Sequence, residues 1–453
     1  MRIGAAWSSV IFALALASGC GGDDGGGSGT GGSGGSAGTS SGEGGASGQA
    51  GASGASGSGA TSGGGAGGTS GGGAGGTGGS GGGGAGGAGG TGGTPSGDPI
   101  ALAQVAAKAD AACGVTADGK LACWGDNTNG GLVGEPAADT TAPKWIDEAT
   151  DWAEVTLGSQ HACVRKSSGE IACWGSDLTG ALGSSATQGV GSNFPPVAID
   201  VAGPWQHVSA EQEHSCAIHM DGTLYCWGKI EVGEAVHAPT QVGTDNDWIA
   251  LATGGQHACA IKASGALYCW GSNYKGQLGQ GGELPTSTNG VLQAEAPLQV
   301  GTDTDWVEVA CGDKHACARK ESGAIFCFGE NLEGQIGDSS FDPRTSPTQA
   351  TADTDWAEVK ASGASTCARK QDSTLWCWGK VADHFRPLTS TSLEPVKIST
   401  ESGWTSLAVG GAIVCAIRDN AETVCWGSNQ SGQLGDGTTD LHQDGVTVLA
   451  PAP

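Results

Sequence analysis

The segment at residues 259–271, CAIKASGALYCWG, consists of two short apolar runs that are separated by a Ser-Gly pair and closed by Trp-Gly. This pattern predicts a β-hairpin. Cys259 and Cys269 stand ten positions apart. In an antiparallel hairpin folded about Ser264, these two cysteines would lie directly opposite each other.

The same hairpin unit occurs seven times with the same cysteine spacing. Its cysteine pairs are Cys113 and Cys123, Cys163 and Cys173, Cys216 and Cys226, Cys259 and Cys269, Cys317 and Cys327, Cys367 and Cys377, and Cys415 and Cys425. An aromatic residue and then a glycine follow each second cysteine; the aromatic residues are Trp124, Trp174, Trp227, Trp270, Phe328, Trp378 and Trp426. Units that recur about every 50 residues indicate a propeller or a solenoid.

Two further positions repeat upstream of the hairpin in units two to seven. A tryptophan stands eleven residues before the first cysteine, at Trp152, Trp205, Trp248, Trp306, Trp356 and Trp404. A proline stands twenty residues before it, at Pro143, Pro196, Pro239, Pro297, Pro347 and Pro395. We therefore expect four strands per unit: A from the proline, B from the tryptophan, C with the first cysteine and D with the second. Seven such units predict a seven-bladed β-propeller of four-stranded antiparallel blades.

The first and last units differ from the others in a complementary way. Twenty positions before Cys113 the chain is glycine-rich, so the first unit has no strand A of its own. Beyond the seventh unit, residues 446–449 read as an additional strand. We expect this C-terminal strand to complete blade one and close the ring, which would remove open sheet edges.

The first 97 residues contain no propeller unit. Residues 1–20 have the pattern of a secretion signal, and small residues before Cys20 resemble a bacterial lipobox, which predicts acylation of Cys20. The alternative is ordinary secretion without a lipid. Residues 21–97 are nearly all Gly, Ser, Ala and Thr, a composition that predicts a disordered tether. This organisation leaves residues 98–453 for the propeller and predicts export across the inner membrane to a lipid-anchored position at the outer membrane or cell surface.

The formal net charge of −26 lies almost wholly in the repeats. Nucleic-acid binding needs a basic surface, so this charge excludes nucleic acid as the expected partner. Paired cysteines at this density favour an oxidising compartment.

The units resemble the regulator of chromosome condensation repeat family. Three motifs carry this resemblance: Gly-x-x-His-x-Cys, as at residues 158–163, Cys-Trp-Gly, and Trp-Gly-x-Asn followed by Gly-Gln-Leu-Gly, as at residues 270–279 and 426–435. The resemblance implies a seven-bladed propeller. The founding member is a nuclear nucleotide exchange factor, a role that the acidic charge, signal sequence and cysteine pairs do not fit, and other members bind proteins through their loops. Units three and six depart from the motif, because Lys229 and Lys380 follow their Trp-Gly and no Gly-Gln-Leu-Gly comes after.

The cysteines and histidines each allow two interpretations. The Cys-x9-Cys spacing does not match zinc sites, so we expect all fourteen paired cysteines to form disulfides across the hairpins. Cys311 is left over and is expected to be a buried, inert thiol, with a reactive thiol as the alternative. The recurrent histidines His161, His214, His257 and His315 could form a catalytic or metal ring, but we expect structural hydrogen bonds to the repeat backbone.

The motif Asp-x-Asp-Trp occurs in three A–B turns, at Asp245 and Asp247, Asp303 and Asp305, and Asp353 and Asp355. Paired carboxylates suit calcium. We expect instead that they are solvated or form ion pairs between blades with the basic C–D turns, and we predict no metal and no cofactor.

The variable part of the repeat predicts where binding occurs. Between the strand D aromatic residue and the next proline the number of residues varies from 11 to 26, while the remaining spacing is fixed in blades two to seven. All these D–A connections should lie on one rim, which we call the D–A rim, and variable loops on a rigid scaffold often bind ligands. Aromatic residues in them are expected interaction anchors, namely Phe194, Tyr274, Phe341 and Phe385.

We therefore expect a monomeric, non-enzymatic binding module whose partner is a protein or a surface glycan. The alternatives are a hydrolase or lyase with a site on the rim or in the central channel, and a calcium-stabilised adhesion module.

Overall fold

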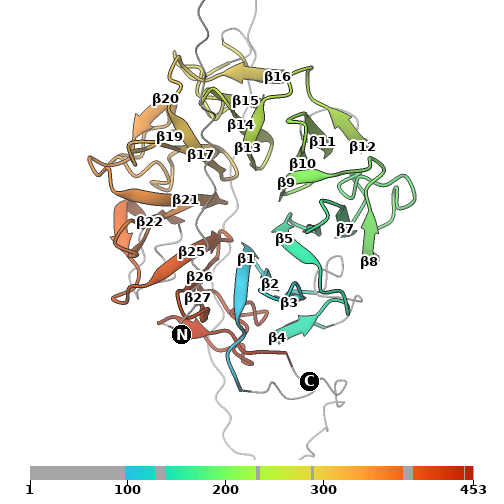
Figure 1. The fold of residues 1–453 in the computed structure, drawn as a ribbon. Coiled ribbons are helices and arrows are strands. Elements are labelled where there is room, and N and C mark those ends of the chain that lie inside the picture. Colours follow the sequence, from blue (N-terminus) through green and yellow to red (C-terminus); the bar gives the residue numbers. More distant parts are fainter. Residues whose placement is uncertain are drawn as a thin grey trace, which may run out of the picture. The chain divides into compact units, whose positions relative to one another are not determined.

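The computed structural model describes residues 97–127, 138–230, 235–286, 290–380, 391–442 and 444–451. In this part of the chain 28 strands form seven antiparallel sheets of four strands each. Figure 1 shows the sheets arranged as blades around a central axis. The prediction of a seven-bladed β-propeller is confirmed.

The innermost strand of each blade faces the central channel. Six of these strands begin at the recurrent tryptophan, and blade one begins with Leu102 instead. They are β1 (Leu102–Lys108), β5 (Trp152–Leu157), β9 (Trp205–Glu211), β13 (Trp248–Thr253), β17 (Trp306–Cys311), β21 (Trp356–Ser362) and β25 (Trp404–Val409).

The two middle strands of each blade form the disulfide hairpin. The second strands are β2 (Ala111–Thr116), β6 (His161–Lys166), β10 (His214–His219), β14 (His257–Lys262), β18 (His315–Lys320), β22 (Ser365–Lys370) and β26 (Ile413–Arg418). The third strands are β3 (Leu121–Gly125), β7 (Ile171–Gly175), β11 (Leu224–Gly228), β15 (Leu267–Ser272), β19 (Ile325–Gly329), β23 (Leu375–Gly379) and β27 (Thr423–Gly427).

The proline-containing strands lie at the outer edge of the blades. They are β4 (Thr140–Trp145), β8 (Asn193–Ala198), β12 (Val236–Gln241), β16 (Gln293–Gln299), β20 (Arg344–Gln349) and β24 (Ser392–Lys397), and β28 (Val446–Thr447) occupies the same place in blade seven.

This arrangement corrects the expected role of strand A. Each strand A pairs with the strand D that precedes it in the chain, as β4 does with β3, so it belongs to the preceding blade. The strands also begin a few residues before the proline, since Pro297 lies inside β16. Proline has no N–H to donate, which an edge strand tolerates.

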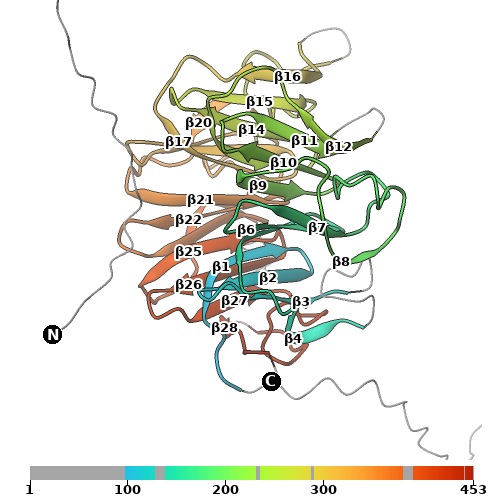
Figure 2. The same cartoon turned by 45° about the vertical axis from the view of Figure 1, so that its right-hand side comes forward.

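Ring closure involves the C-terminal segment, but not in the expected blade. β28 pairs with β27 and completes blade seven, with Val446 opposite Cys425. Blade one is complete without it. The seam between blades seven and one is closed by the residues that follow β28. There, Ile100 N donates to Val448 O at 3.0 Å and Ala450 N donates to Asp98 O at 2.7 Å. Figure 2 shows β28 close to the start of β1.

The hydrophobic core is divided among seven clusters, and each cluster joins two neighbouring blades. Small residues of the second strand oppose large aromatic residues of the third, as Ala162 does Trp174 and Ala258 does Trp270. Both tryptophans are buried, at 0% and 2% exposure. This size matching fills the space between blades at the close packing of a protein interior.

All seven cysteine pairs lie at directly opposed positions of the hairpins, and the structure joins each pair as a disulfide. The Cα–Cα separations are 4.0 to 4.1 Å. From blade one to blade seven, the bonds join Cys113 to Cys123, Cys163 to Cys173, Cys216 to Cys226, Cys259 to Cys269, Cys317 to Cys327, Cys367 to Cys377 and Cys415 to Cys425. Each bond therefore links the two middle strands of one blade, and none links two blades.

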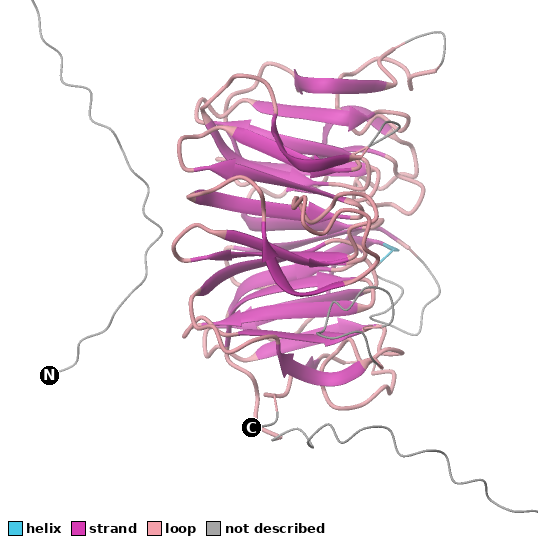
Figure 3. Ribbon diagram, turned by 90° about the vertical axis from the view of Figure 1, so that its right-hand side faces the viewer, coloured by secondary structure: helices cyan, strands magenta, loops and turns pink. Residues whose placement is uncertain are grey.

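The strand order places the D–A connections and the turns between first and second strands on one rim. The short hairpin turns between second and third strands lie on the other, together with the connections between blades. The two rims are seen edge-on in Figure 3. Within the described residues, no helix has the length and apolar character needed to cross a bilayer.

Candidate interaction surface

The D–A connections of blades two, four, five and seven begin with the same turn. A buried Asp or Asn follows the third strand, and its Oδ1 accepts a hydrogen bond from the backbone N–H five residues later. The pairs are Asp177 with Leu182, Asn273 with Leu278, Asn331 with Ile336 and Asn429 with Leu434, at 2.9 to 3.0 Å. The motif Asn-x-x-Gly-Gln-Leu-Gly therefore encodes a closed turn.

This turn inserts between its own blade and the next, and we call it the clasp. Its aliphatic side chain, Leu182, Leu278, Ile336 or Leu434, is fully buried. The following glycine lies against the strand D aromatic residue of the next blade. At Gly337 the backbone has φ +82°, and an added Cβ would lie 2.7 Å from Trp378 Nε1. Only glycine fits this position without displacing the indole.

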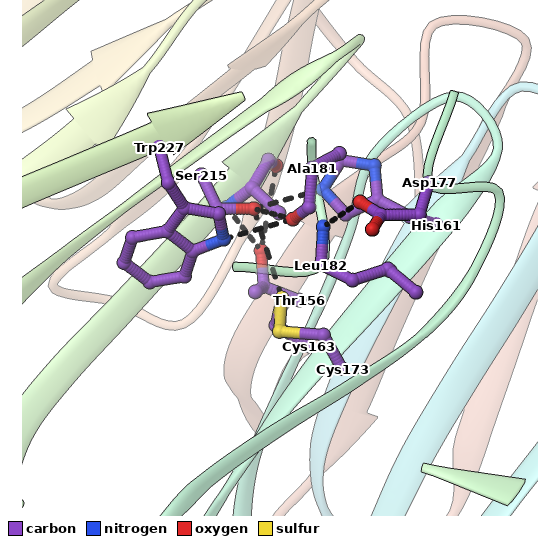
Figure 4. Close-up of a disulfide and its surroundings, with 10 residues drawn as sticks. Thr156, His161, Cys163, Cys173, Asp177, Ala181, Leu182, Ser215 and Trp227 are labelled. Atoms are coloured by element: carbon purple, nitrogen blue, oxygen red, sulfur yellow. Dashed lines mark hydrogen bonds between the residues drawn. A yellow bond between two sulfur atoms is a disulfide. The ribbon is translucent and has the colours of Figure 1, made fainter. Parts of the chain in front are cut away.

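The clasp also supplies a hydrogen-bond acceptor to the next blade. The indole Nε1 donates to a clasp carbonyl from Trp227 to Ala181 O at 2.8 Å, from Trp378 to Gln335 O at 3.0 Å and from Trp124 to Gln433 O at 2.9 Å. Ser215 Oγ also donates a hydrogen bond to Ala181 O, the carbonyl that accepts from Trp227. Figure 4 shows the His161 ring beside Ser215, with 2.8 Å between His161 Nε2 and Ser215 Oγ. The clasp therefore ties two blades together through both apolar and polar contacts.

The residue after the buried Asp or Asn faces away from the blades. Leu178 and Leu332 are 62% exposed and Tyr274 is 48% exposed at this position of blades two, five and four. Phe341, later in the same connection as Leu332, is 51% exposed. The D–A connections thus hold a set of exposed apolar side chains on the D–A rim that do not contribute to the core.

The four predicted anchor residues have different outcomes. Tyr274 and Phe341 lie in D–A connections, and their side chains are accessible, as expected. Phe194 lies within β8, is half-buried and packs against the core cluster between blades one and two, so it is not a loop residue. The edge strand starts before its proline, and this extra length incorporates Phe194. Phe385 lies outside the described residues.

Leu178 and Leu332 were not among the predicted anchors. The prediction considered only aromatic residues, which are the commonest interface anchors. Alignment of the clasp turns would have identified both leucines, because they stand at the repeat position of Tyr274.

On the opposite rim, recurrent lysines and aspartates form ion pairs with one another. Lys262 contacts Asp245 and Asp247 at 2.7 and 3.0 Å. The ammonium groups of Lys262, Lys320 and Lys370 each lie over the tryptophan that begins the innermost strand of the same blade, at 4.7 to 4.9 Å from the ring centroid. These Lys clamps tie the connection between two blades to the hairpin turn of the blade that it enters, so the expected ion pairs with the basic hairpin turns are present, although they do not join strands of two blades. The same contacts join Lys320 to Asp303 and Asp305, and Lys370 to Asp353 and Asp355.

The clamps change the pKa of the lysines. Burial alone would lower the pKa of Lys320, but its contacts with Asp303 and Asp305 raise the pKa overall. The same balance holds for Lys262 and Lys370. Since each aspartate pair already neutralises a cation, this arrangement does not favour calcium.

The recurrent histidines are part of the core. His161, His214, His257 and His315 are at most 1% exposed. Gly158, Gly254 and Gly312 lie directly under the rings of His161, His257 and His315, where an added Cβ would clash. Burial lowers the pKa of His161, His214 and His257 to about 3 and that of His315 to about 4. Such buried neutral rings fill structural positions.

The central channel is lined by the innermost strands, and its carboxylates are paired. Glu154 contacts Arg165 at 2.9 Å and His207 at 2.5 Å, and Glu308 contacts Arg319 at 3.0 Å and Lys360 at 3.3 Å. Burial would raise the pKa of Glu154, but His207 and Arg165 lower it overall. A general acid needs a raised pKa, so this channel carboxylate does not fit that role.

Cys311 is a free, buried cysteine at the end of β17. Burial raises the pKa of its thiol far above the usual range, which makes it a poor nucleophile. Its Sγ lies near Cys259 and His257, and the three potential ligand atoms are within 4.8 Å of one another. Because Cys259 is bonded to Cys269, it is not a free thiolate ligand.

The sequence matches two models of known protein families. A model of the RCC1-like domain matches residues 155–451, and a model of the regulator of chromosome condensation (RCC1) repeat matches residues 102–130. The chain belongs to the RCC1-like domain family. The RCC1-like match covers most of the propeller, in agreement with the resemblance carried by the clasp and hairpin motifs.

Solved structures share the RCC1-like fold at low sequence identity. A chain in the crystal structure of Kap60 bound to yeast RCC1 (Prp20) is 20% identical, with 72% of this chain and 83% of that chain covered and a TM-score of 0.62. Human WBSCR16 is 16% identical, with 73% and 95% covered and a TM-score of 0.63. The probable E3 ubiquitin-protein ligase HERC6 of Homo sapiens is 28% identical over 144 residues, 29% of this chain, and the match spans 14% of HERC6.

Proposed function

We propose that this RCC1-like propeller binds another protein through the D–A rim and is held at the cell envelope by a lipid on Cys20. The exposed side chains of Leu178, Tyr274, Leu332 and Phe341 carry the binding proposal. Three of them occupy one repeat position, and buried hydrogen bonds fix the backbone that presents them.

Rigid presentation favours binding for a physical reason. A flexible loop loses conformational entropy when a partner orders it, whereas a preorganised turn loses little. Large apolar side chains that are buried in a partner supply most of the binding energy of a typical interface. The clasps therefore provide what an interaction surface needs.

A protein is the class of partner that best fits the charge. The formal net charge of −26 disfavours nucleic acid. Yeast RCC1, a propeller of similar fold, is bound to Kap60 in one of the compared crystal structures, which is a precedent for a protein partner. A surface glycan is the alternative ligand for the exposed Tyr and Phe rings.

The envelope location rests on the N-terminal sequence and on the disulfides. Small residues before Cys20 match a lipobox, and seven disulfides suit an oxidising compartment. Cys20 itself lies outside the described residues. Changing Cys20→Ser should move the full chain from the detergent phase to the soluble fraction, and an unchanged distribution would contradict anchoring.

The binding proposal can be tested with two sets of surface changes. The control variant combines Met220→Ala and Val307→Ala near the opposite rim, where the two side chains are 60% and 43% exposed. The rim variant, in the full chain, combines Leu178→Ala, Tyr274→Ala, Leu332→Ala and Phe341→Ala. Both the control variant and the rim variant should melt close to the wild-type temperature, since exposed side chains contribute little to stability.

The readout is capture of a partner from the envelope of the producing cell by the immobilised full chain. Loss of these exposed anchors, each of which would contribute about 2 kcal/mol or more when buried in the partner, should abolish capture by the rim variant only. If the control variant loses capture and the rim variant keeps it, the proposed face is wrong.

A further inference from the structure

Blade three lacks the clasp motif. Its connection from β11 to β12, residues 229–235, contains no Asn-x-x-Gly-Gln-Leu-Gly sequence. The strand D aromatic residue of the next blade, Trp270, therefore has no such turn to receive its indole N–H. This position differs from those of Trp124, Trp227 and Trp378, which all donate to a clasp carbonyl.

Trp270 is left with an unpaired polar atom. Its side chain is 2% exposed, and Nε1 has no hydrogen-bond partner among the described residues. Native proteins pair nearly all buried donors, so each exception calls for an explanation. Here the quasi-symmetry of the ring provides one, because the missing acceptor is the group that the clasp supplies elsewhere.

A cavity of about 360 Å³ lies beside this indole. We call it the blade three–four cleft. Its volume falls in the range of small ligand pockets. Its walls combine apolar side chains and the unpaired indole donor with the polar residues Thr240, Gln241, Gln293 and Glu295. The lining includes Trp227, Ile230 and Val242 of blade three together with Trp270, Gly271 and Ala294 of blade four.

Ile230, near the start of the blade three connection, is one of the residues that line the cleft. It is half-buried and packs against the cluster that contains Trp270. It replaces some of the contact that Leu182 or Ile336 makes in the clasped blades, but it brings no acceptor to the indole donor.

We propose that the blade three–four cleft binds a clasp-like turn of the partner protein. The turn would carry a Leu or Ile side chain for the apolar walls, a preceding residue whose backbone carbonyl accepts from Trp270 Nε1, and a following glycine. This inference rests on the proposed protein-binding function and defines the segment of the partner that is recognised. Gly228, Ile230 and Gly271 lie where the cleft reaches the D–A rim, so the turn would enter from that side.

The chain itself provides a probe of known conformation. A peptide with the sequence of residues 330–343 contains the complete clasp of blade five, including Gln335, Ile336 and Gly337. Binding of this peptide to the full chain can be followed by the indole N–H signal of Trp270 in an NMR spectrum of protein labelled with ¹⁵N at tryptophan. A peptide with Ile336→Asp is the matched negative control.

Two variants of the protein test the two parts of the inference. Trp270→Phe removes the donor together with part of the indole ring, and Phe328 shows that phenylalanine is accepted at this repeat position. A graft that replaces residues 229–235 by the sequence of residues 330–343 joins the same strand ends and should place a clasp in the cleft.

The wild-type chain should bind the peptide and shift the Trp270 signal. Trp270→Phe should weaken binding about fivefold, the factor expected for one hydrogen bond. The graft should melt at a higher temperature and lose peptide binding.

The inference fails if the wild-type chain does not bind the peptide at millimolar concentration, or if Trp270→Phe binds it as tightly as the wild type. If peptide binding fails while the D–A rim variant still loses its partner, only this inference is overturned and the proposed function stands.

Discussion

The four buried histidines of the second strands make the propeller sensitive to acid. Their pKa values are lowered by burial to about 3 for His161, His214 and His257 and to about 4 for His315. The ordinary value is about 6.5. Below pH 6.5 the unfolded chain therefore binds protons that the folded chain does not, which favours unfolding.

The free energy of unfolding should accordingly fall as the pH drops from 6.5 towards 4. Each buried histidine contributes a decrease of about 1.4 kcal/mol per pH unit. His207 acts in the opposite direction, because although burial lowers its pKa, Glu154 raises it overall. Denaturant melts at pH 7, 6 and 5 would measure the slope. His161→Gln should be less stable at pH 7 but show a shallower slope, and a wild-type stability that is independent of pH would contradict the argument.

The Lys clamps predict that calcium is not a structural ligand. Asp303 and Asp305 already contact Lys320 at 2.6 and 3.0 Å. A chelator, or millimolar calcium, should therefore leave the melting temperature unchanged. A rise of several degrees with calcium that disappears in Asp303→Asn would show that the aspartates bind the ion in preference to the lysine.

At the scale of the element, the clasp depends on a glycine that has no room for a side chain. In Gly337→Ala the new Cβ would clash with Trp378, and the backbone would be held at φ +82°. Gly282→Ala is a matched control, because φ is +81° and no described atom lies within 4 Å of the added Cβ. The control should lose about 1 kcal/mol of stability from the backbone conformation alone. Gly337→Ala should lose more, as measured by denaturant melts, and equal losses would show that the clasp adapts.

The hairpin is the second element with a clear prediction. Seven disulfides leave Cys311 as the free cysteine of the described residues. Thiol counting on the denatured, unreduced propeller should find one thiol. Cys367→Ser with Cys377→Ser should lower the free energy of unfolding by about 2 to 3 kcal/mol, since a closed loop restricts the unfolded chain. Seven or more free thiols in the wild type would contradict both the pairing and the oxidising compartment.

At the scale of the whole molecule, stability depends on the seam of the ring. Removing residues 446–453 deletes the outer strand of blade seven and the acceptor that holds Ile100. The truncated chain should melt at a lower temperature or aggregate through the exposed sheet edge. Val448→Asp, which places a charge at a fully buried position, should have a similar effect without shortening the chain. An unchanged melting curve for both variants would show that the seam is not needed.

Much of the fold was predictable because the fixed spacing determines local pairing. Cys259 opposite Cys269 and Ala258 opposite Trp270 follow from the hairpin register. The blade to which strand A belongs was not predictable, because the repeat spacing is the same whether it pairs with the strand before or after it. At the rim, Tyr274 could be found from its residue type. Leu178 stands at the repeat position of Tyr274 but was missed because only aromatic residues were considered as anchors. The unpaired indole donor of Trp270 could be found only from the three-dimensional contacts.

The offset of one strand between sequence units and blades also affects how such a protein can evolve. Each unit gives its first strand to the preceding blade and three strands to a blade of its own, as β4 and β5–β7 do. A tandem duplication of one unit would therefore add one whole blade and leave every other blade with four strands. The terminal strand β28 would still complete the last blade. Gene duplication can thus change the number of blades in steps of one without creating an incomplete sheet along the way.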